Sequence, residues 1–345
     1  MTKSPGVGRL LAVVAMAVAL RGRAALAEER LKIAMPGVPP VFGSVVTYVA
    51  RDEGFFKKYG VDVEVRSFDS GAAAAQAVVA GDIDASLSPT PVVVRMVSNA
   101  GVDLVAIYGM QNPDWLLGST DAALNKCKDV DGQSVGVDSI GGARAAALEQ
   151  LIRPCGLKLD RVKLVSLSTN VGAAMVAGQL KLGVLHQDDV PVLEEQLGRP
   201  LTVVQSFQDV NQRSHYLSLV STRAKLGQKR DAYVRTLAAI IDATRYALNP
   251  ANVDRVAKIA AVTGRSEKIA KEALPRFAKM ELWPVGHDGL PRANLESVVA
   301  VEKELGSIKP GKTPATYEQL TDRTVWKDAE ALVRKRGDTA AGEKK

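Results

Sequence analysis

The fold is decided by the stretch from Pro36 to Pro91, PGVPPVFGSVVTYVARDEGFFKKYGVDVEVRSFDSGAAAAQAVVAGDIDASLSPTP, in which strand and helix patterns alternate. Ser44 to Lys58 has the apolar spacing of a helix, and Val61 to Ser67 alternates as a strand does. Gly71 to Ala80 predicts a second helix, with Ser70 as its N-terminal cap. Gly-, Ser- and Pro-rich turns separate these segments, so the stretch indicates an α/β protein with mostly parallel sheets.

The same alternation continues along the chain. Further strands are predicted at Leu31 to Met35, Ala85 to Ser88, Asp103 to Tyr108 and Ser134 to Asp138. Further helices are predicted at Val92 to Asn99, Ala143 to Arg153, Lys229 to Ala247, Val253 to Val262, Glu267 to Phe277 and Trp326 to Arg336. A length of 345 residues is too much for one small core and favours two domains.

A partial internal repeat supports two lobes of similar design, although two helices rich in small residues could match by chance. Gly71 to Pro89 aligns with Gly172 to His186, which places Pro89 opposite His186. The chain is expected to cross between the lobes at Met110 to Trp115 and to return at Arg213 to Val220. The expected organisation is residues 1–27 as a signal peptide, 28–112 and 217–325 as the first lobe, 113–216 as the second lobe, and 326–345 as a C-terminal helix with a disordered tail.

The first residues are typical of an export signal. Lys3 and Arg9 precede an apolar run, Leu10 to Leu20, that is too short to span a bilayer, and Ala25-Leu26-Ala27 fits a cleavage site. The alternative is an uncleaved membrane anchor. Residues 1–27 hold four of the 45 basic residues and none of the 38 acidic ones, so the rest of the chain has an excess of three positive charges. Such a small excess gives no support to nucleic-acid binding.

The two cysteines can form a disulfide. Cys127 precedes the strand predicted at Ser134, and Cys155 follows the helix that runs back along that strand, so both lie at the same end of one unit. An oxidising compartment would allow the bond if the two Cα atoms come within about 7 Å. The alternative is that one of them is a nucleophile, although neither stands in a Gly-rich turn beside a histidine.

Ligands of open α/β sheets bind beyond the carboxyl ends of the strands, and this rule selects the candidate binding residues. Glycines in these loops let a ligand approach the backbone. The helix starts near Ser70, Gly142 and Asn170 offer unpaired N–H groups to an anion, unless they are ordinary capped turns. The candidates are Pro39, Phe42, Ser44, Ser70, Gly71, Ala72, Ser88, Pro89, Thr90, Gln111, Trp115, Ser139, Gly141, Gly142, Arg144, Thr169, Asn170, His186, Asp188 and Tyr216.

Several of these side chains admit more than one role. Arg144 can pair with a ligand carboxylate or sulfonate, or it can brace the lobe. Trp115 and Tyr216 can stack on a ligand ring or pack in the core. Asp188 and the adjacent Asp189 would suit a pyrimidine or an amine better than an anion. The three histidines in the chain show no metal-ligand spacing, so no metal site is expected.

Two segments carry a resemblance to a known family: ARDEGFFKKYGVDV, Ala50 to Val63, and AGDIDA, Ala80 to Ala85. They resemble the first lobe of the bacterial periplasmic solute-binding proteins of the NMT1/THI5-like group, which serve ABC importers of sulfonates, taurine, nitrate, thiamine precursors and aromatic acids. The resemblance implies a two-lobed type II periplasmic binding protein fold, with a mostly parallel sheet flanked by helices in each lobe and two crossover strands. It also implies that the C-terminal helices wrap the first lobe, that the three helix starts converge on one cleft, and that the protein is periplasmic.

The resulting prediction is a monomeric receptor that closes over a small organic anion, a sulfonate or a carboxylate, and delivers it to an ABC permease and its ATPase. No cofactor, metal or nucleic acid is expected, and the protein is not expected to be an enzyme. One alternative is an enzyme on the same fold, such as a desulfinase or a pyrimidine synthase. Others are a binding protein for a pyrimidine or thiamine precursor and a sensory or adaptor protein that uses the cleft as a switch.

Overall fold

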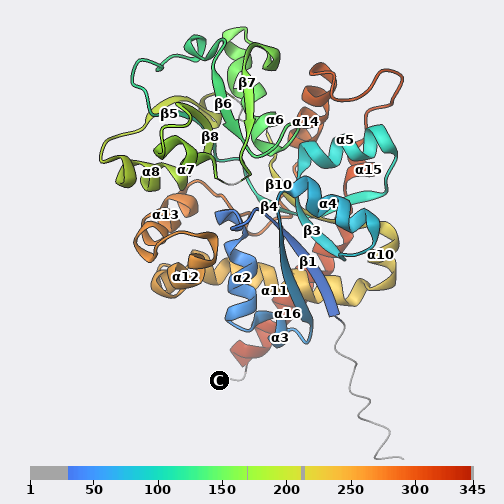
Figure 1. Cartoon of the computed structure of the whole chain (residues 1–345). Coiled ribbons are helices and arrows are strands. Elements are labelled where there is room, and N and C mark those ends of the chain that lie inside the picture. The colour runs from blue at the N-terminus through green and yellow to red at the C-terminus, as the bar shows by residue number, and fades with distance from the viewer. Residues whose placement is uncertain (1–29, 169, 211–213, 343–345) are drawn as a thin grey trace, which may run out of the picture.

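The computed structural model describes residues 30–168, 170–210 and 214–342, with side chains to residue 336. It contains two five-stranded sheets, each in its own lobe, one above the other in Figure 1. The predicted signal peptide, Thr169, Arg213 and the last three residues of the predicted tail lie outside the described residues.

The first sheet has the strand order β2-β1-β3-β10-β4. β1 lies parallel to β2 and β3, whereas β10 runs antiparallel to both β3 and β4. Both β3 and β4 are buried along their whole length, as expected where helices cover both faces of a sheet. The strands are β1 (Arg30–Pro36), β2 (Asp62–Phe68), β3 (Ala85–Pro89), β4 (Leu104–Gln111) and β10 (Leu217–Thr222).

The second sheet repeats this plan in the order β7-β6-β8-β5-β9, with β5 as the reversed strand. In each sheet the reversed strand is the one that enters from the other lobe. Pro89 ends β3 and His186 ends β8, so the alignment of the internal repeat is confirmed. The strands are β5 (Trp115–Ser119), β6 (Ser134–Val137), β7 (Lys163–Ser166), β8 (Leu182–His186) and β9 (Thr202–Ser206).

Helices cover both faces of the first sheet, and the C-terminal helices wrap this lobe as predicted (Figure 1). One face carries α2 (Val45–Asp52), α3 (Phe55–Lys58), α11 (Arg230–Leu248) and α16 (Thr324–Gly342), with α12 (Val253–Ala260) and α13 (Glu267–Lys279) beside them. The other face carries α4 (Gly71–Ala80), α5 (Thr90–Ala100), α14 (Arg292–Glu304) and α15 (Tyr317–Leu320). A short helix, α10 (Arg223–Gln228), follows β10.

Three local expectations need correction. The single helix predicted over Ser44 to Lys58 is two helices, because the backbone at Gly54 turns to φ 71°, a left-handed conformation that ends a helix. The last helix begins at Thr324 and packs on α11. The sequence analysis did not identify α14 and α15, whose apolar residues complete the second core of the first lobe.

The second lobe holds α6 (Ala143–Ile152), α7 (Val171–Val176), α8 (Asp189–Leu197) and α9 (Phe207–Val210). A disulfide joins Cys127 to Cys155, with the two Cα atoms 6.0 Å apart, in agreement with the sequence expectation. It links the turn before β6 to the end of α6. Both cysteines of the chain are therefore used in this bond.

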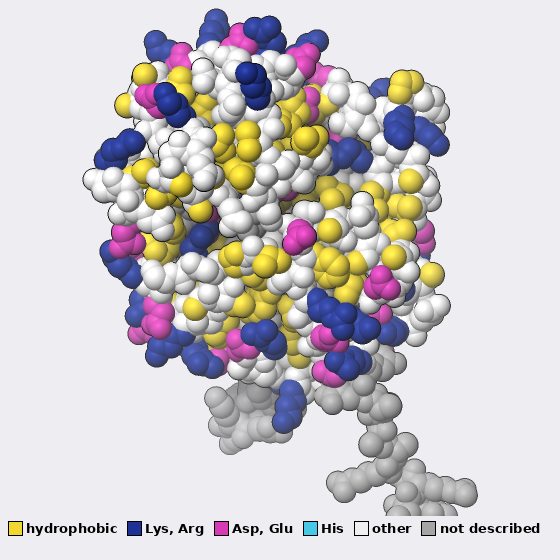
Figure 2. All heavy atoms as spheres, viewed as in Figure 1, with side chains coloured by type: hydrophobic (Ala, Val, Ile, Leu, Met, Phe, Trp, Pro, Cys, Tyr) yellow, Lys and Arg dark blue, Asp and Glu magenta, His cyan; other side chains and the backbone are white. Residues whose placement is uncertain are grey.

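The chain crosses between the sheets twice, at residues 112–114 between β4 and β5 and again between α9 and β10. In two-lobed proteins, paired crossings of this kind can act as a hinge between the lobes. On the face shown in Figure 2, Lys and Arg side chains are interspersed with Asp and Glu side chains rather than gathered in one patch. None of the described helices is long and apolar enough to cross a membrane.

Candidate ligand-binding cleft

A cavity of about 30 Å³ lies between the two lobes, beyond the carboxyl ends of β1 and β8. The first lobe contributes the loop after β1 and the turn between α12 and α13. The second lobe contributes the start of α6 and the turn between β8 and α8. The lining residues are Pro39, Pro40, Val41, Phe42, Thr263 and Arg265 from the first lobe, and Arg144, His186, Asp188 and Asp189 from the second.

Five of the predicted site residues therefore meet around one cavity: Pro39, Phe42, Arg144, His186 and Asp188. A second cavity of about 190 Å³ adjoins it through shared lining residues, among them Asp189 and Arg265, and includes the predicted Asn170. The structure thus brings residues from both lobes together where the strand-end rule placed them.

Four predicted residues bury a polar atom that has no hydrogen-bond partner among the described residues. These atoms are Ser44 Oγ, Gln111 Oε1, Arg144 Nε and His186 Nε2, and their residues are at most 4% exposed. Thr47 and Thr236, in helices of the first lobe, are the other two such cases. A buried polar group without a partner costs free energy. Of these four residues, Arg144 and His186 line the cavity, so their unpartnered atoms indicate a surface that can contact a ligand.

Asp114 organises the second-lobe side of the cleft. Its carboxylate accepts hydrogen bonds from Gln111 Nε2 at 3.1 Å and from the Gln187 amide at 3.4 Å, and its Oδ1 lies 2.7 Å from His186 Nδ1. The bond from Gln111 Nε2 turns Oε1 of the same amide away, and that oxygen is the unpartnered acceptor. The sequence analysis did not identify Asp114, which stands in a crossover with no periodic pattern around it.

Trp115 and Tyr216 pack against His186 inside the protein. The Trp115 and His186 rings lie 3.7 Å apart between centroids, and Tyr216 meets Trp115 edge-on at 4.7 Å. Burial raises the pKa of Tyr216 well above its ordinary value, which keeps the phenol neutral. Of the two roles foreseen for these rings, the structure shows packing that fixes the orientation of His186.

Arg144 is buried and both braces the second lobe and faces the cavity. Its guanidinium donates to the Ser168 carbonyl at 3.3 Å and to Asp189 Oδ2 at 3.4 Å, and it lies 5.6 Å from the centre of the Trp115 ring. Nε is left without a partner. One N–H donor of this side chain is therefore available to a ligand.

Arg265 is a cleft residue that sequence reasoning missed. It lies between α12 and α13 of the first lobe and reaches across to the second lobe, where Nε donates to Asp188 Oδ2 at 2.7 Å and Nη2 pairs with Asp189 Oδ1. Only the packing of the C-terminal helices brings it to the cleft, and no periodic pattern signals that. The two pairs join the lobes directly.

The two acids that Arg265 contacts have pKa values shifted in opposite directions. Burial raises the pKa of Asp188, and the charges of Asp189 and Asp114 raise it further against the opposing effect of Arg265. For Asp189 burial also favours a higher pKa, but the charges of Arg265 and Arg144 outweigh burial and lower it. Negative charge is therefore held firmly at Asp189 and less firmly at Asp188.

The predicted anion site at the start of α6 is wrong as a free helix N-terminus. The carboxylate of Asp138 accepts from the amides of Ala143 at 2.9 Å and Arg144 at 3.0 Å. A Cβ added at Gly142 would lie 2.5 Å from the same carboxylate, so this glycine accommodates Asp138 rather than a ligand. The neighbouring Ser139 closes the turn through its carbonyl, and Gly141 accepts a bond from Arg95 of the first lobe.

The predicted residues near α4 and β3 use their polar groups within the first lobe. Ser70 caps α4 by accepting from the Ala73 amide at 3.2 Å, and Ser88 donates to the Gly71 carbonyl at 3.2 Å. Thr90 Oγ1 lies 2.7 Å from Nδ1 of His215, whose pKa burial lowers to about 4. Ala72 packs against the core, and Pro89 is buried at the end of β3.

The cluster of Asp114, His186 and Asp188 has ligand atoms within 4.8 Å of one another, a spacing that can hold a metal ion. In the described structure each member already has a partner. Arg265 contacts Asp188, while His186 and Gln111 contact Asp114. The described contacts therefore form a network of ion pairs and hydrogen bonds that joins Asp114, His186 and Asp188 to Arg265 and Gln111.

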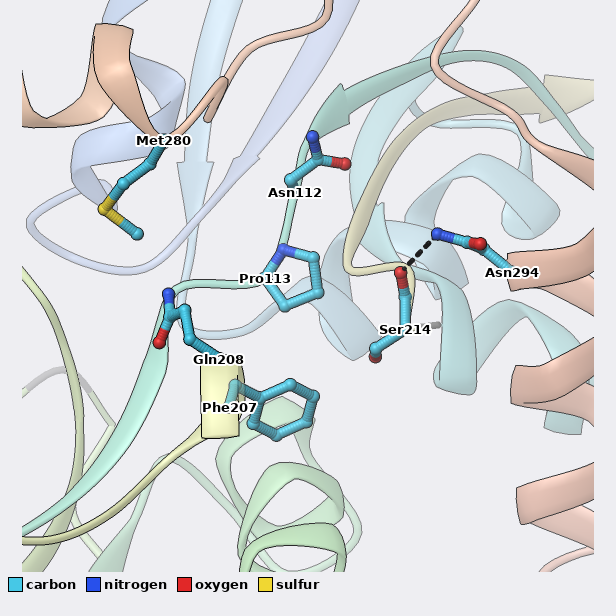
Figure 3. A pocket seen from close by; sticks show the side chains of 7 residues that line it. All are labelled: Asn112, Pro113, Phe207, Gln208, Ser214, Met280 and Asn294. Atoms are coloured by element: carbon cyan, nitrogen blue, oxygen red, sulfur yellow. Dashed lines mark hydrogen bonds between the residues drawn. The ribbon is translucent and has the colours of Figure 1, made fainter. Parts of the chain in front are cut away.

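A larger cavity of about 430 Å³ lies at the hinge, beside the two crossovers (Figure 3). Asn294 Nδ2 donates to the Ser214 carbonyl there at 3.0 Å, and Met280 and Phe207 supply apolar surface. Of the described residues that line it, none is charged and none buries an unpartnered polar atom. The cleft between the lobes is therefore the better candidate site.

The architecture defines the class of protein: two lobes with matching sheets, two crossovers and a cleft between the lobes form a periplasmic binding protein fold. The sequence profile described as "NMT1/THI5 like" matches residues 42–252, and the chain belongs to this family. A Brucella abortus (strain 2308) protein named "Putative binding protein BAB2_1146" is 20% identical over 312 residues, covering 90% of this chain and 96% of its own.

Two solved structures illustrate the likeness of fold. A protein of Bordetella bronchiseptica RB50 has a TM-score of 0.73 at 20% identity, over 88% of this chain and 97% of its own. The periplasmic aliphatic sulphonate binding protein SsuA from Escherichia coli has a TM-score of 0.65 at 17% identity, over 85% of this chain and 92% of its own. At these identities the comparison shows the shared fold.

Proposed function

We propose that this protein is the extracytoplasmic substrate-binding protein of an ABC importer. It captures a small organic molecule with an anionic group, a carboxylate or a sulfonate, between its two lobes. Hinge closure then presents the loaded form to a permease and its ATPase in the inner membrane. The family, the fold of its solved relatives and the expected signal peptide at residues 1–27 support a periplasmic location, and we propose that the receptor acts as a monomer.

The observation that carries the proposal is the pair of buried, unpartnered polar atoms that the second lobe presents to the cavity, Arg144 Nε and His186 Nε2. The first lobe supplies the facing wall of the same cavity, with Pro39, Phe42 and Thr263. A ligand that contacts both walls is held only when the lobes are together. Ligand binding and closure are coupled in this way, because the ligand favours the state that satisfies more of its contacts.

Direct bonds between the lobes add to the closed state. Besides the pairs made by Arg265, Arg153, which directly follows α6, contacts Glu304 of α14 at 2.7 Å, and Ser168 Oγ donates to the Asp69 carbonyl at 3.1 Å. The Arg153–Glu304 pair is exposed, so it contributes at most about 1 kcal/mol. This exposed pair therefore adds little to closure.

An enzyme on the same fold is the second candidate. A desulfinase-like reaction would use a cysteine nucleophile, but both cysteines of this chain are joined in the disulfide, away from the cleft. A thiolate is the reactive form, and a disulfide sulfur does not provide one. The receptor is accordingly the better supported function.

The test is a ligand screen by thermal shift, followed by small-angle scattering. The protein is freed of carried-over ligand by unfolding and refolding, then tested with sulfonates, aliphatic and aromatic carboxylates, nitrate and pyrimidines. A true ligand at about 100 times its dissociation constant adds about 2.7 kcal/mol of stability. The proposal expects such a hit, with compaction and no turnover. Chemical conversion of the ligand, or binding without any compaction, would contradict it.

A further inference from the structure

The charged groups that line or support the cleft carry no positive excess. Three buried carboxylates and two guanidinium groups lie here: Asp188 and Asp189 pair with Arg144 and Arg265, whereas Asp114 bonds to His186 and Gln111. His186 beside Asp114 adds at most one further positive charge. With the carboxylates ionised, the net charge of this cleft charge cluster is −1 when His186 is neutral and zero when His186 is protonated.

Neither guanidinium is free to neutralise a purely anionic ligand. Arg265 is engaged by Asp188 and Asp189, and Arg144 shares Asp189 with it. A ligand carrying only an anion would leave the buried cluster at −1 or −2. Burying an unbalanced charge is costly, so such a ligand would bind weakly or would have to displace one of the acids.

The same cavity nevertheless presents a hydrogen-bond donor, on Arg144, that has no acceptor among the described residues. Arg144 Nε is an unpartnered donor on a side chain that is 5% exposed, and both Arg144 and His186, whose Nε2 is also unpartnered, line the cavity with Asp188. A guanidinium N–H is always a donor, so the group it meets on the ligand must be an acceptor, best an anionic oxygen.

We infer that the ligand is zwitterionic, with an anionic oxygen group on Arg144 and a cationic nitrogen facing Asp188 and its neighbouring acids. This inference rests on the proposed receptor function and names its ligand class. A zwitterion leaves the charge of the cluster unchanged, supplies the missing acceptor and adds a cation where acids are in excess. The raised pKa of Asp188, caused by burial and then by Asp189 and Asp114 against Arg265, is the response expected of such an excess.

The experiment compares matched ligands that differ only in charge. By calorimetry, taurine is tested against propane-1-sulfonate and propylamine, and 4-(aminomethyl)benzoate against 4-ethylbenzoate and 4-methylbenzylamine. The inference expects the zwitterion of at least one set to bind at least tenfold more tightly than either partner, which corresponds to about 1.4 kcal/mol. Anion-only members that bind as tightly as the zwitterions, or more tightly, would overturn the inference and leave the proposed receptor function standing. Binding of no member of either set at millimolar concentration, by folded protein, would overturn both the inference and the proposed ligand class.

A variant locates the cation site within the cleft. Asp188→Asn removes one acid of the cluster, and the preference for the zwitterion over the anion-only partner should then fall below threefold. Asp160→Asn, an exposed acid of the second lobe, is the matched control and should keep the full preference. An unchanged preference in Asp188→Asn would contradict the placement of the cationic nitrogen. A merely structural role of Asp188 would weaken all members of a set alike, and a melting curve checks that the variant folds.

Discussion

Glu149 provides a pH-dependent test of how the two lobes meet. It lies on α6 of the second lobe, and burial raises its pKa to about 7. The charge of Glu302 on α14 of the first lobe raises the pKa further, whereas the charges of Arg95 and Arg153 lower it. The folded protein therefore binds this proton more tightly than the unfolded chain does. Stability is unaffected below the ordinary pKa near 4.5 and is lost as the pH rises through about 7.

The variant Glu149→Gln removes the free-energy cost of ionising Glu149 in the folded protein. The rise of more than two pH units corresponds to at most about 3 kcal/mol, and because Glu149 is only partly buried we expect a gain of about 1–2 kcal/mol. The gain should appear at pH 8 and vanish at pH 4, as measured by urea unfolding of wild type and variant at both values. The exposed acid Glu272 provides the control variant Glu272→Gln, which should show little difference between the two pH values. Equal effects of Glu149→Gln at both pH values, or destabilisation at pH 8, would refute the interpretation.

Three further predictions concern the cleft and the fold. Arg144→Gln should weaken ligand binding at least tenfold, about 1.4 kcal/mol, by calorimetry. Arg161→Gln, which removes an exposed arginine that pairs within the second lobe, should change the affinity little. Equal affinity in Arg144→Gln would remove this residue from the site. Replacing both Cys127 and Cys155 by serine should lower the free energy of unfolding by about 3 kcal/mol, because the bond closes a loop of 28 residues. An unchanged melting temperature would show that the bond does not form in solution. Gly71→Ala should destabilise the first lobe by about 1–3 kcal/mol, because its Cβ would lie 2.2 Å from Pro89 Cδ. In the control Gly81→Ser, the new Cβ would meet no atom within 4 Å, so only the left-handed backbone would lower stability. A melting curve equal to wild type for Gly71→Ala would contradict this packing.

Much of the fold could be predicted from local patterns. Ser70 caps α4 and Gly81 ends it, so both ends of that helix were visible in the sequence. The repeat that pairs Pro89 with His186 was visible because the same small-residue helix precedes both strands. By contrast, the break at Gly54 was missed, because a single glycine within an apolar helical pattern does not by itself show whether the helix ends there.

The site was predictable only in part. The strand-end rule found Phe42, Arg144 and His186, because it depends on topology that the sequence reveals. Arg265 and Asp114 escaped because they stand in turns whose position depends on tertiary packing. The predicted free N-terminus of α6 was wrong because Asp138, the last residue of the strand predicted before this loop, turns its carboxylate onto the helix start, a contact that the strand pattern does not reveal.

The central claim is that a ligand closes the two lobes over the cleft, and a distance measurement between the lobes tests it most directly. Spin labels at Arg199, just after α8, and Glu272 on α13, both exposed, report the separation of the lobes, and neither residue lines a cavity of the cleft. With a saturating ligand from the screen, the account predicts a single, short and narrow distance distribution, and a longer and broader one without ligand. Identical distributions with and without saturating ligand would contradict the account.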